Sequence, residues 1–446
     1  MISTKTATIP LPGHSVTSAR EKTLILPNRR AKPGAVDSPL SRENKLVYDS
    51  MADPQNQNLN KTVNLEYRHM LTHTQEQFFA LLRAGLWDKP IDTEELGTDV
   101  DWKEIYKIAR EQTVIGLIAD AINTLPAAQR PPMPILQRFI MEKLAIERSH
   151  VKLNAVLNEV VQALNAHNIP HILLKGQGVA QNYAHPTSRT CGDIDLYVGE
   201  KNYTKANIII KAISDHPEKK AEESIKHASF KVNGVEIEVH RMASILDSRK
   251  SDRCFQKFTR EMLDAGMQAP IEKTLLKQWN NDGILINLPP QDYNAVFLLI
   301  HMMRHLIEGG IGFRQACDWV RFLHRHQLDP EQIAQILTDT GLKKVWNSFA
   351  GLSYKYLGLP KARLPVGTKV NERAADRIVA IIFATGNFGH HDVDNIKAHD
   401  QRHFIHKLKR FIYHIKYYNK SLMIFPKLSI LATSQWIIRN IKKMGS

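Results

Sequence analysis

Two aspartates separated by one residue carry the clearest chemical signal in the chain. Asp193 and Asp195 lie in the run 193–198, whose alternating apolar residues predict a β-strand. Alternate strand residues point to the same face, so the two carboxylates share one face while Ile194 is buried on the other. Two such charges side by side repel by about 4 kcal/mol at an effective dielectric constant near 20. This pairing favours a divalent cation, because Mg²⁺ takes carboxylate oxygens together with substrate phosphates.

A predicted β-hairpin downstream supplies a third carboxylate. Asn233-Gly234 joins two short alternating segments, 228–232 and 235–239, and this dipeptide is typical of a tight hairpin turn. The second strand carries Glu236 and Glu238 on one face. A site for two metal ions needs a ligand from a strand distant in sequence. We therefore expect one of these glutamates to join the aspartate pair.

The residues expected to bind phosphate lie between the first two predicted strands. The run 169–174 is typical of a buried strand and leads directly into Lys175 and Gly176. A glycine at a strand end allows the backbone to approach a phosphate closely. Arg189 and Gly192 come just before the aspartate pair. The planar guanidinium of Arg189 suits bidentate contacts with a phosphate or a carboxylate.

The order of these features resembles a known superfamily. A strand, Lys-Gly, a helix, an Asp-x-Asp strand, a helix and an acidic strand together resemble the palm of the DNA polymerase β-like nucleotidyltransferases. More narrowly, the chain resembles a family of uncharacterised nucleotidyltransferases from about residue 75 to the C-terminus. The motifs that carry this narrower resemblance are LLKG, Arg189, GDIDLYV, Glu238-Val239-His240, and the segments 301–305 and 310–319.

The resemblance implies an α+β fold, with a small mixed sheet of polymerase β-like type embedded in a mostly helical body. It implies transfer of a nucleoside monophosphate from an NTP such as ATP to an acceptor hydroxyl, with release of pyrophosphate. Mg²⁺ is the expected ion and Mn²⁺ the alternative. Asp193 and Asp195 would bridge two metal ions, and Glu238 would ligate the second ion or accept the proton. The expected nucleotide- and phosphate-binding residues are Lys175, Gly176, Arg189 and Gly192.

Several alternatives stay open at these positions. The two aspartates could instead cap a turn and pair with Arg189, and Lys175 could be an exposed lysine at a strand end. The hairpin face admits Glu236 as well as Glu238, but Glu238 holds the acid-x-His position and is preferred. His240 could hydrogen-bond a ligand carboxylate rather than contact substrate.

A predicted helix over 293–307 carries His301 and His305 four residues apart, hence on one face. Buried or hydrogen-bonded histidines are one interpretation, since the sequence lacks the remaining features of a zinc-protease helix. In the other interpretation this helix faces the active cleft. Arg304 and Arg314 would then contact substrate phosphates, and Asp318 would be the partner of either arginine.

The chain is expected to have five parts. Its other predicted helices span 102–123, 134–168, 202–214, 313–326, 330–340 and 342–357. The parts are a disordered basic N-terminal tail (1–70), an N-terminal helical region (71–168), the nucleotidyltransferase palm (169–248), a C-terminal helical lobe (249–395) and basic amphipathic C-terminal helices (396–446).

The net charge of +15 is concentrated in the two tails. Residues 1–70 have a net charge of +4 and residues 396–446 of +10, so the intervening residues are near +1. A basic groove across the whole molecule is therefore not expected. The stripe 404–418 and its continuation at 430–441 could dock on the core, lie on an anionic membrane surface or bind nucleic acid.

Three widely spaced cysteines, Cys191, Cys254 and Cys317, are typical of reduced thiols, and Cys191 is expected to be a small packed residue. We find no secretory signal and no apolar run of about 20 residues, so a cytoplasmic location without a transmembrane segment is expected. The acceptor could be a small molecule, a protein or an RNA. The alternative function is a non-catalytic scaffold that senses nucleotides or binds protein or nucleic acid.

Overall fold

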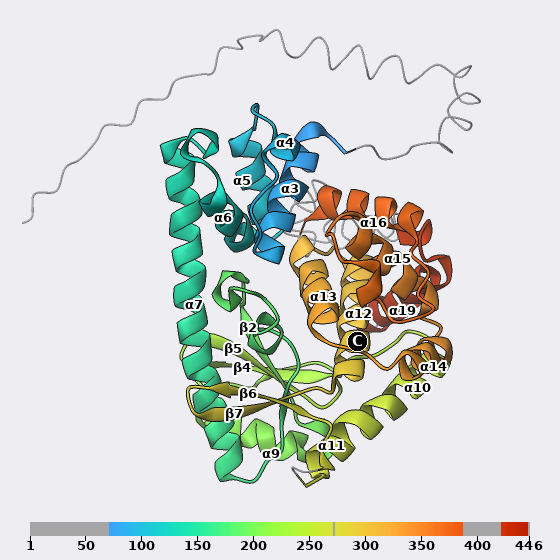
Figure 1. The fold of residues 1–446 in the computed structure, drawn as a ribbon. Helices are drawn as coiled ribbons and strands as arrows, with labels where there is room; N and C mark the ends of the chain where they lie inside the picture. Colours follow the sequence, from blue (N-terminus) through green and yellow to red (C-terminus); the bar gives the residue numbers. More distant parts are fainter. Residues whose placement is uncertain (1–70, 271–272, 387–420, 445–446) are drawn as a thin grey trace, which may run out of the picture. The chain divides into compact units, whose positions relative to one another are not determined.

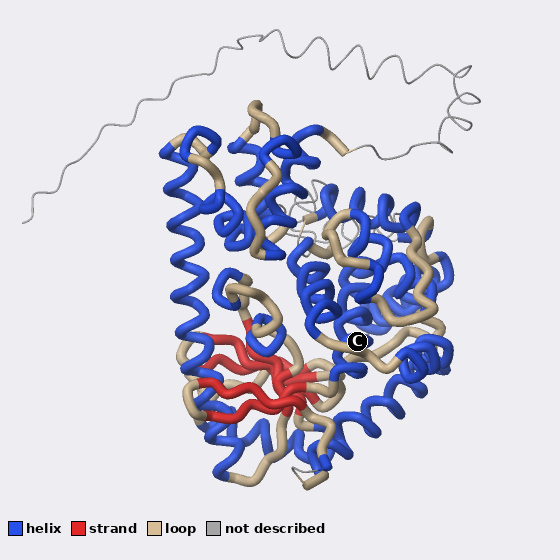
Figure 2. The backbone as a smooth tube through the Cα atoms, viewed as in Figure 1, coloured by secondary structure: helices blue, strands red, loops and turns tan. Residues whose placement is uncertain are grey.

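A five-stranded mixed sheet lies between one long helix and a group of C-terminal helices (Figure 1). The computed structural model of the chain describes residues 71–270, 273–386 and 421–444. The expected N-terminal tail and the basic stripe 404–418 lie outside these residues. In the described part, the strands gather into one patch and helices make up most of the remainder (Figure 2). The expected α+β architecture, a small mixed sheet within a helical body, is confirmed.

The sheet has the strand order β1-β2-β5-β4-β3, and its neighbours are antiparallel except for the parallel pair β2–β5. Asn233 and Gly234 join β4 to β5 with φ of 50° and 73°, which confirms the predicted tight hairpin. The parallel pairing places β5 in the middle of the sheet beside the aspartate strand. The strands are β1 (Ile172–Leu173), β2 (Asp193–Tyr197), β3 (Glu222–Glu223), β4 (His227–Val232) and β5 (Val235–His240).

One face of this sheet is apolar and covered by helices α7 (Met133–Ala166) and α9 (Gly199–Ala212). Ile194 and Leu196 of β2 are fully buried there, as the strand alternation predicts. The buried side of α7 is the predicted one, with Leu153, Val156, Leu157, Val160, Val161 and Leu164 in the same core. The carboxylates of β2 must therefore use the opposite face.

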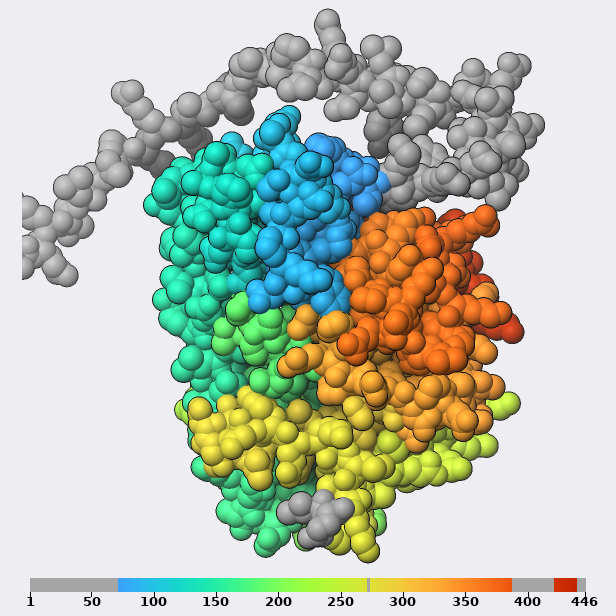
Figure 3. Space-filling model, in the orientation of Figure 1, coloured from blue at the N-terminus to red at the C-terminus, as the bar shows by residue number. Residues whose placement is uncertain are grey.

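A second hairpin, β6 (Lys277–Asn281) and β7 (Ile284–Leu288), was not predicted. It lies in a region expected to be helical, and it turns at Asp282 and Gly283, which have φ of 48° and 89°. The hairpin belongs to the core of the main sheet, since Ile286 is fully buried in the cluster that α7 covers. In the space-filling view its yellow segment lies at the surface beside α7 (Figure 3).

The predicted helix over 102–123 is two helices, because the chain turns at Thr113 with φ of 55°. A positive φ is unusual for a β-branched residue, so this turn is strained. The long helix predicted over 134–168 is confirmed as α7. The N-terminal helices are α3 (His73–Trp87), α4 (Thr93–Leu96), α5 (Trp102–Glu111) and α6 (Ile115–Thr124).

The C-terminal helices form a second core around Trp319 and Trp346, whose indole rings meet edge to face with centroids 5.0 Å apart. The four helices predicted between 293 and 357 are confirmed, with their ends shifted by at most two residues. The helices are α10 (Arg249–Thr259), α11 (Ala265–Gln268), α12 (Gln291–Glu308), α13 (Phe313–Arg325), α14 (Pro330–Thr340), α15 (Lys343–Lys355), α16 (Glu372–Thr385) and α19 (Pro426–Met444).

Helix α19 docks one side on this second core. Leu428, Ala432 and Trp436, spaced four residues apart, pack against the helical cluster. Docking is thus the outcome for the described part of the C-terminal stripe. Among the described residues, no helix combines the length and apolar character needed to cross a bilayer.

Candidate active site

Three carboxylates meet on the polar face of the sheet. The β2–β5 register pairs Asp195 with Glu238 and Asp193 with Glu236. Oxygen atoms of Asp193, Asp195 and Glu238 lie within 4.8 Å of one another. Glu238 is thus the glutamate that reaches the aspartate pair, while Glu236, two residues earlier on the same strand, is exposed. A divalent cation would fit this oxygen set.

Lys175 neutralises part of this charge. Its Nζ lies 3.0 Å from Asp195 Oδ1 and 3.5 Å from Asp193 Oδ2. The backbone hydrogen bond from Leu174 to the Asp195 carbonyl (3.0 Å) places Lys175 at this point. Burial alone would lower the pKa of Lys175, but the charges of Asp195 and Asp193 outweigh it and raise that pKa. Lys175 is therefore a half-buried cation in contact with the carboxylates and not an exposed lysine at a strand end.

The next residue, Gly176, has φ of +65° and begins the short helix α8 (Gln177–Ala180). Its sign of φ accounts for glycine at this position. Gly192 is different, because a Cβ added there would meet no atom within 4 Å. Packing therefore does not account for the glycine at 192, and the space in front of its backbone is open.

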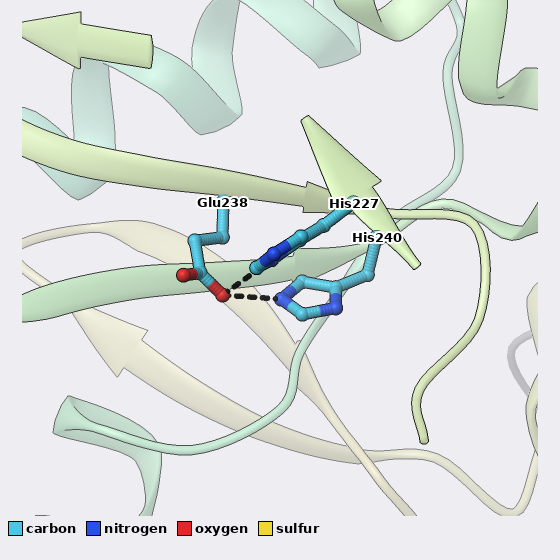
Figure 4. Close-up of side chains that lie close together, drawn as sticks. All are labelled: His227, Glu238 and His240. Carbon is cyan, nitrogen blue, oxygen red and sulfur yellow. Dashed lines mark hydrogen bonds and ion pairs between the residues drawn. The ribbon is translucent and has the colours of Figure 1, made fainter. Parts of the chain in front are cut away.

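Two histidines hold Glu238 in place (Figure 4). His227 donates from Nδ1 to Glu238 Oε2 at 2.7 Å, and His240 donates from Nε2 to the same oxygen at 3.0 Å. Burial would raise the pKa of Glu238, but these hydrogen bonds outweigh it and lower that pKa strongly. His240 Nε2 also lies 3.1 Å from Asp195 Oδ1. His227 was not predicted as a site residue, because it faces this set only through the pairing of β4 with β5.

Asp195 is the most deeply placed of the three carboxylates. Its side chain is fully buried, and its Oδ2 has no hydrogen-bond partner. Burial raises the pKa of Asp195, Lys175 lowers it, and the neighbouring Asp193 raises it; the net direction is upward. For Asp193 the charge of Lys175 is the largest influence, and it lowers the pKa of that carboxyl. A buried acceptor without a partner is costly in a protein interior and is well matched to a cation.

Arg189 occupies a separate, fully paired position. Its Nε and Nη2 donate to the two oxygens of Asp318 at 2.7 and 2.6 Å, and both side chains are 6% exposed. Its Nη1 donates to the Thr190 carbonyl at 3.2 Å and to Cys191 Sγ at 2.8 Å. Each guanidinium nitrogen is therefore engaged. Of the two partners expected for the fork of Arg189, the geometry shows the carboxylate, that of Asp318, and not a phosphate. Two other expectations are corrected: Arg189 does not pair with the aspartates, and Asp318 pairs with Arg189 rather than with Arg304 or Arg314.

A cavity of about 400 Å³ opens beside the carboxylates, within the usual range for small-molecule sites. The loop 189–193 forms one wall and residues of α12 and α13 form another. Lysine, arginine and histidine side chains line it together with backbone of two glycines. The lining residues are Thr113, Lys175, Gly176, Arg189, Thr190, Cys191, Gly192, Asp193, Glu236, Leu298, His301, Met302, Arg314, Gln315 and Asp318.

Among the cationic residues that line the cavity, Arg314 has a guanidinium nitrogen without a hydrogen-bond partner. Its Nη1 donates to the Thr190 carbonyl at 2.9 Å, while its buried Nε has no hydrogen-bond partner. Burial lowers the pKa of Arg314, and the nearby positive charge of Arg189 lowers it further. Thr113 also lines the cavity, and its buried Oγ1 has no partner. Its strained turn between α5 and α6 had no recognisable sequence signal.

The remaining predicted site residues on α12 are two neighbouring histidines, one of which lines the cavity, and an arginine that does not. His301 lines the cavity, and its ring packs at 4.4 Å against that of His305. Burial lowers the pKa of both, that of His305 to about 3, so both are neutral near pH 7. Arg304 instead donates to the Ile245 carbonyl and pairs with Glu308. It is absent from the cavity lining, so the structure does not bring it to the carboxylates with Arg314.

Comparison with known proteins places this geometry in context. The sequence profile of a family described as "Uncharacterised nucleotidyltransferase" matches residues 98–358, which include the whole sheet and cavity lining. No curated protein matches significantly. Among solved structures, the crystal structure of an antigenic nucleotidyltransferase-like protein from Paracoccidioides brasiliensis is similar at 14% identity, over 43% of this chain and 91% of that one. Its TM-score is 0.28.

Proposed function

The chain belongs to a family of uncharacterised nucleotidyltransferases, and from this premise we propose that it transfers a nucleoside monophosphate from an NTP to an acceptor hydroxyl, releasing pyrophosphate. The observation that carries the proposal is the meeting of Asp193, Asp195 and Glu238 on one face of the sheet, within 4.8 Å of one another. The acceptor and the preferred NTP are identified by the experiment below. A cytoplasmic site of action stays a prediction.

The oxygen set fits a divalent cation such as Mg²⁺ or Mn²⁺. Three carboxylates face one lysine, and Asp195 Oδ2 is buried without a partner. Asp193, Asp195 and Glu238 would hold the ion. When bound, such an ion lowers the pKa of an acceptor hydroxyl and offsets the charge that develops on the phosphates.

The protein groups around the carboxylates would orient the reactants. Lys175 is placed to contact the phosphates, because its ammonium contacts both aspartates and its side chain lines the cavity. Glu238 receives two imidazole hydrogen bonds on one oxygen, which keeps the carboxylate ionised. We therefore assign Glu238 as a ligand rather than as the group that accepts the proton, since a base works best with a pKa near the working pH.

The cavity would hold the nucleotide. Gly176 and Gly192 leave backbone accessible to the phosphates, and Arg314 offers a guanidinium nitrogen without a partner. Thr113 and His301 line the same space and would contact the nucleotide further from the metal ion. Arg189 contributes through position, since its pair with Asp318 fixes the loop that presents Gly192.

The test is incubation of the full-length protein with Mg²⁺ and each α-³²P-labelled NTP in turn, alone and with cell extract. Label transferred to protein, RNA or a small molecule is the expected result, and its form identifies the acceptor class. The double variant Asp193→Ala/Asp195→Ala should transfer none. A matched control is Glu222→Ala/Glu223→Ala, which removes two exposed acids from β3 of the same sheet.

Failure has two forms with different meanings. Equal transfer by the aspartate double variant would refute the assignment of the site. No transfer by the wild-type protein, with NTP still bound in a manner that requires the carboxylates, would identify a nucleotide-sensing scaffold instead of an enzyme.

A further inference from the structure

Next to the carboxylates lies a second group of residues whose side chains are typical metal ligands, and two of these ligands are imidazole nitrogens. It consists of His227 on β4 with Glu238 and His240 on β5, here called the histidine triad. The β4–β5 register pairs His227 directly with His240, and Glu238 lies two residues from His240 on the same face. Both rings point at one carboxylate oxygen (Figure 4).

The donor atoms of the triad are close enough to share one ion. His227 Nδ1 and His240 Nε2 lie 2.7 and 3.0 Å from Glu238 Oε2, and all three ligand atoms lie within 4.8 Å of one another. Metal–ligand bonds of about 2.0–2.2 Å to imidazole nitrogen and carboxylate oxygen are compatible with such separations. Two histidines and one carboxylate form a ligand set typical of first-row transition metals.

We propose that the histidine triad binds a divalent transition ion of the Zn²⁺ or Co²⁺ type, distinct from the ion held by the oxygens of the aspartates. The chemistry of the donors separates the two positions. Mg²⁺ takes oxygen ligands, whereas imidazole suits Zn²⁺ and its neighbours in the transition series. Glu238 belongs to both sets, and a carboxylate with two oxygens can bridge a pair of ions about 3.5–4 Å apart.

The surroundings of the triad support a cation there. Asp195 Oδ1 lies 3.1 Å from His240 Nε2, so a second acidic group borders the triad. The other oxygen of Asp195 is buried without a hydrogen-bond partner. The triad itself is sheltered, with side chains of His227 and Glu238 19% exposed and that of His240 6% exposed. Such partial shelter limits competition from water while leaving a route for an ion.

The inference goes beyond the proposed function, since it requires no nucleotide. It is tested by titrating Co²⁺ into full-length protein freed of metal with a chelator. Intense visible d–d absorption distinguishes Co²⁺ bound at low coordination number from the weakly absorbing hydrated ion, and Zn²⁺ and Mg²⁺ are then added as competitors. We expect a saturable Co²⁺ signal that Zn²⁺ displaces and that an equal concentration of Mg²⁺ does not.

Variants distinguish ligation from hydrogen bonding. His227→Asn keeps an amide N–H near the position of Nδ1 and so preserves the bond to Glu238, but an amide is a poor ligand for these ions. We expect it to weaken Co²⁺ binding at least about tenfold without lowering the melting temperature. His216→Ala, which removes an exposed histidine outside the sheet, should bind Co²⁺ as the wild type does. Unchanged binding by His227→Asn, or wild-type binding no tighter for Co²⁺ than for Mg²⁺, would overturn the proposal.

The Asp193→Ala variant separates this proposal from the proposed function. Asp193 is a member of the oxygen set and is absent from the triad. We therefore expect Asp193→Ala to keep the Co²⁺ spectrum even where it abolishes nucleotidyl transfer. Loss of the spectrum in Asp193→Ala would mean that the triad alone does not form the site, and would refute it independently of activity.

Discussion

Two charged regions at the two ends of one short loop differ in how their charges are balanced. Arg189 and Asp318 form a buried one-to-one pair in which each guanidinium nitrogen has a partner. At the other end, Asp193, Asp195 and Glu238 face a single lysine, and one aspartate oxygen has no partner. A balanced pair needs nothing further from a ligand. The unbalanced carboxylate set has excess negative charge that a cation can offset. This difference in charge balance identifies the carboxylate region as the proposed active site.

Breaking the balanced pair should give the largest effect, and on stability. Asp318→Ala leaves the buried guanidinium of Arg189 without its counter-ion, so the free energy of unfolding should fall by about 3–5 kcal/mol. Urea unfolding measures this loss. Glu261→Ala, which breaks the exposed Lys257–Glu261 pair, should change it by less than about 1 kcal/mol.

The double variant Arg189→Met/Asp318→Leu sharpens the interpretation, because it removes both charges together. It should recover most of the stability lost in Asp318→Ala. If Asp318→Ala proves as stable as the wild type and instead loses NTP affinity, the arginine is a phosphate ligand after all.

The unbalanced set should respond in the opposite way. Asp195→Asn should reduce nucleotidyl transfer at least about a hundredfold, or about 2.7 kcal/mol, without lowering the melting temperature. The raised pKa of Asp195 means that its carboxyl favours the folded state at pH below its ordinary pKa. That contribution is lost as the pH rises through the raised value, so the ionised group opposes folding at neutral pH.

Calorimetry at pH 7 with activity measured on the same preparation checks both halves of this prediction. A variant that loses activity and melts well below the wild type would show that Asp195 is a structural residue like Asp318, and the contrast between the regions would fail.

Whether the sequence could predict each of the two regions depends on how far apart in the chain the interacting residues lie. Alternation along a single strand located Asp193 and Asp195, and the Asn233-Gly234 turn fixed the hairpin that delivers Glu238. These are local signals, and the structure brings the three together. The partner of Arg189 lies 129 residues away on α13, and no local pattern links a loop arginine to a helical aspartate at that distance.

The other misses have the same cause. His227 contacts Glu238 because β4 pairs with β5. In the sequence it is a polar residue at the start of a strand, and no local pattern distinguishes it from others of that kind. The β6–β7 hairpin carries an Asp282-Gly283 turn signal, yet its first strand, Lys277–Asn281, is mostly polar. Its burial comes from α7 and the main sheet rather than from its own alternation. At Thr113 the chain leaves the helical pattern through a positive φ, which is unusual for a β-branched residue. Tertiary packing can impose such a turn, and a sequence pattern does not reveal it.

The choice between the two glutamates of β5 is open to a direct comparison. Glu238→Gln removes a carboxylate that lies within 4.8 Å of both aspartates and should lower transfer about 10- to 100-fold. Glu236→Gln, two residues earlier on the same face and exposed, should lower it less than about threefold. Steady-state rates at saturating Mg²⁺ decide the matter. Equal losses would mean that β5 contributes both groups and that the unbalanced region extends to the sheet edge.

Gly192 connects the two regions and gives the smallest effect. A methyl group at this position meets no protein atom within 4 Å, so Gly192→Ala should leave the free energy of unfolding within about 0.5 kcal/mol of the wild type. The same methyl group would enter the cavity in front of the carboxylates. NTP affinity, measured by isothermal titration, should therefore fall about tenfold.

Gly116→Ala is the matched contrast, because a Cβ there would come within 2.1 Å of the Ser188 carbonyl oxygen. That variant should lose stability, since the helix and loop cannot both stay in place. If Gly192→Ala also destabilises the fold, or binds NTP as the wild type does, the open space before Gly192 does not hold the phosphates. The loop would then serve only the balanced pair behind it.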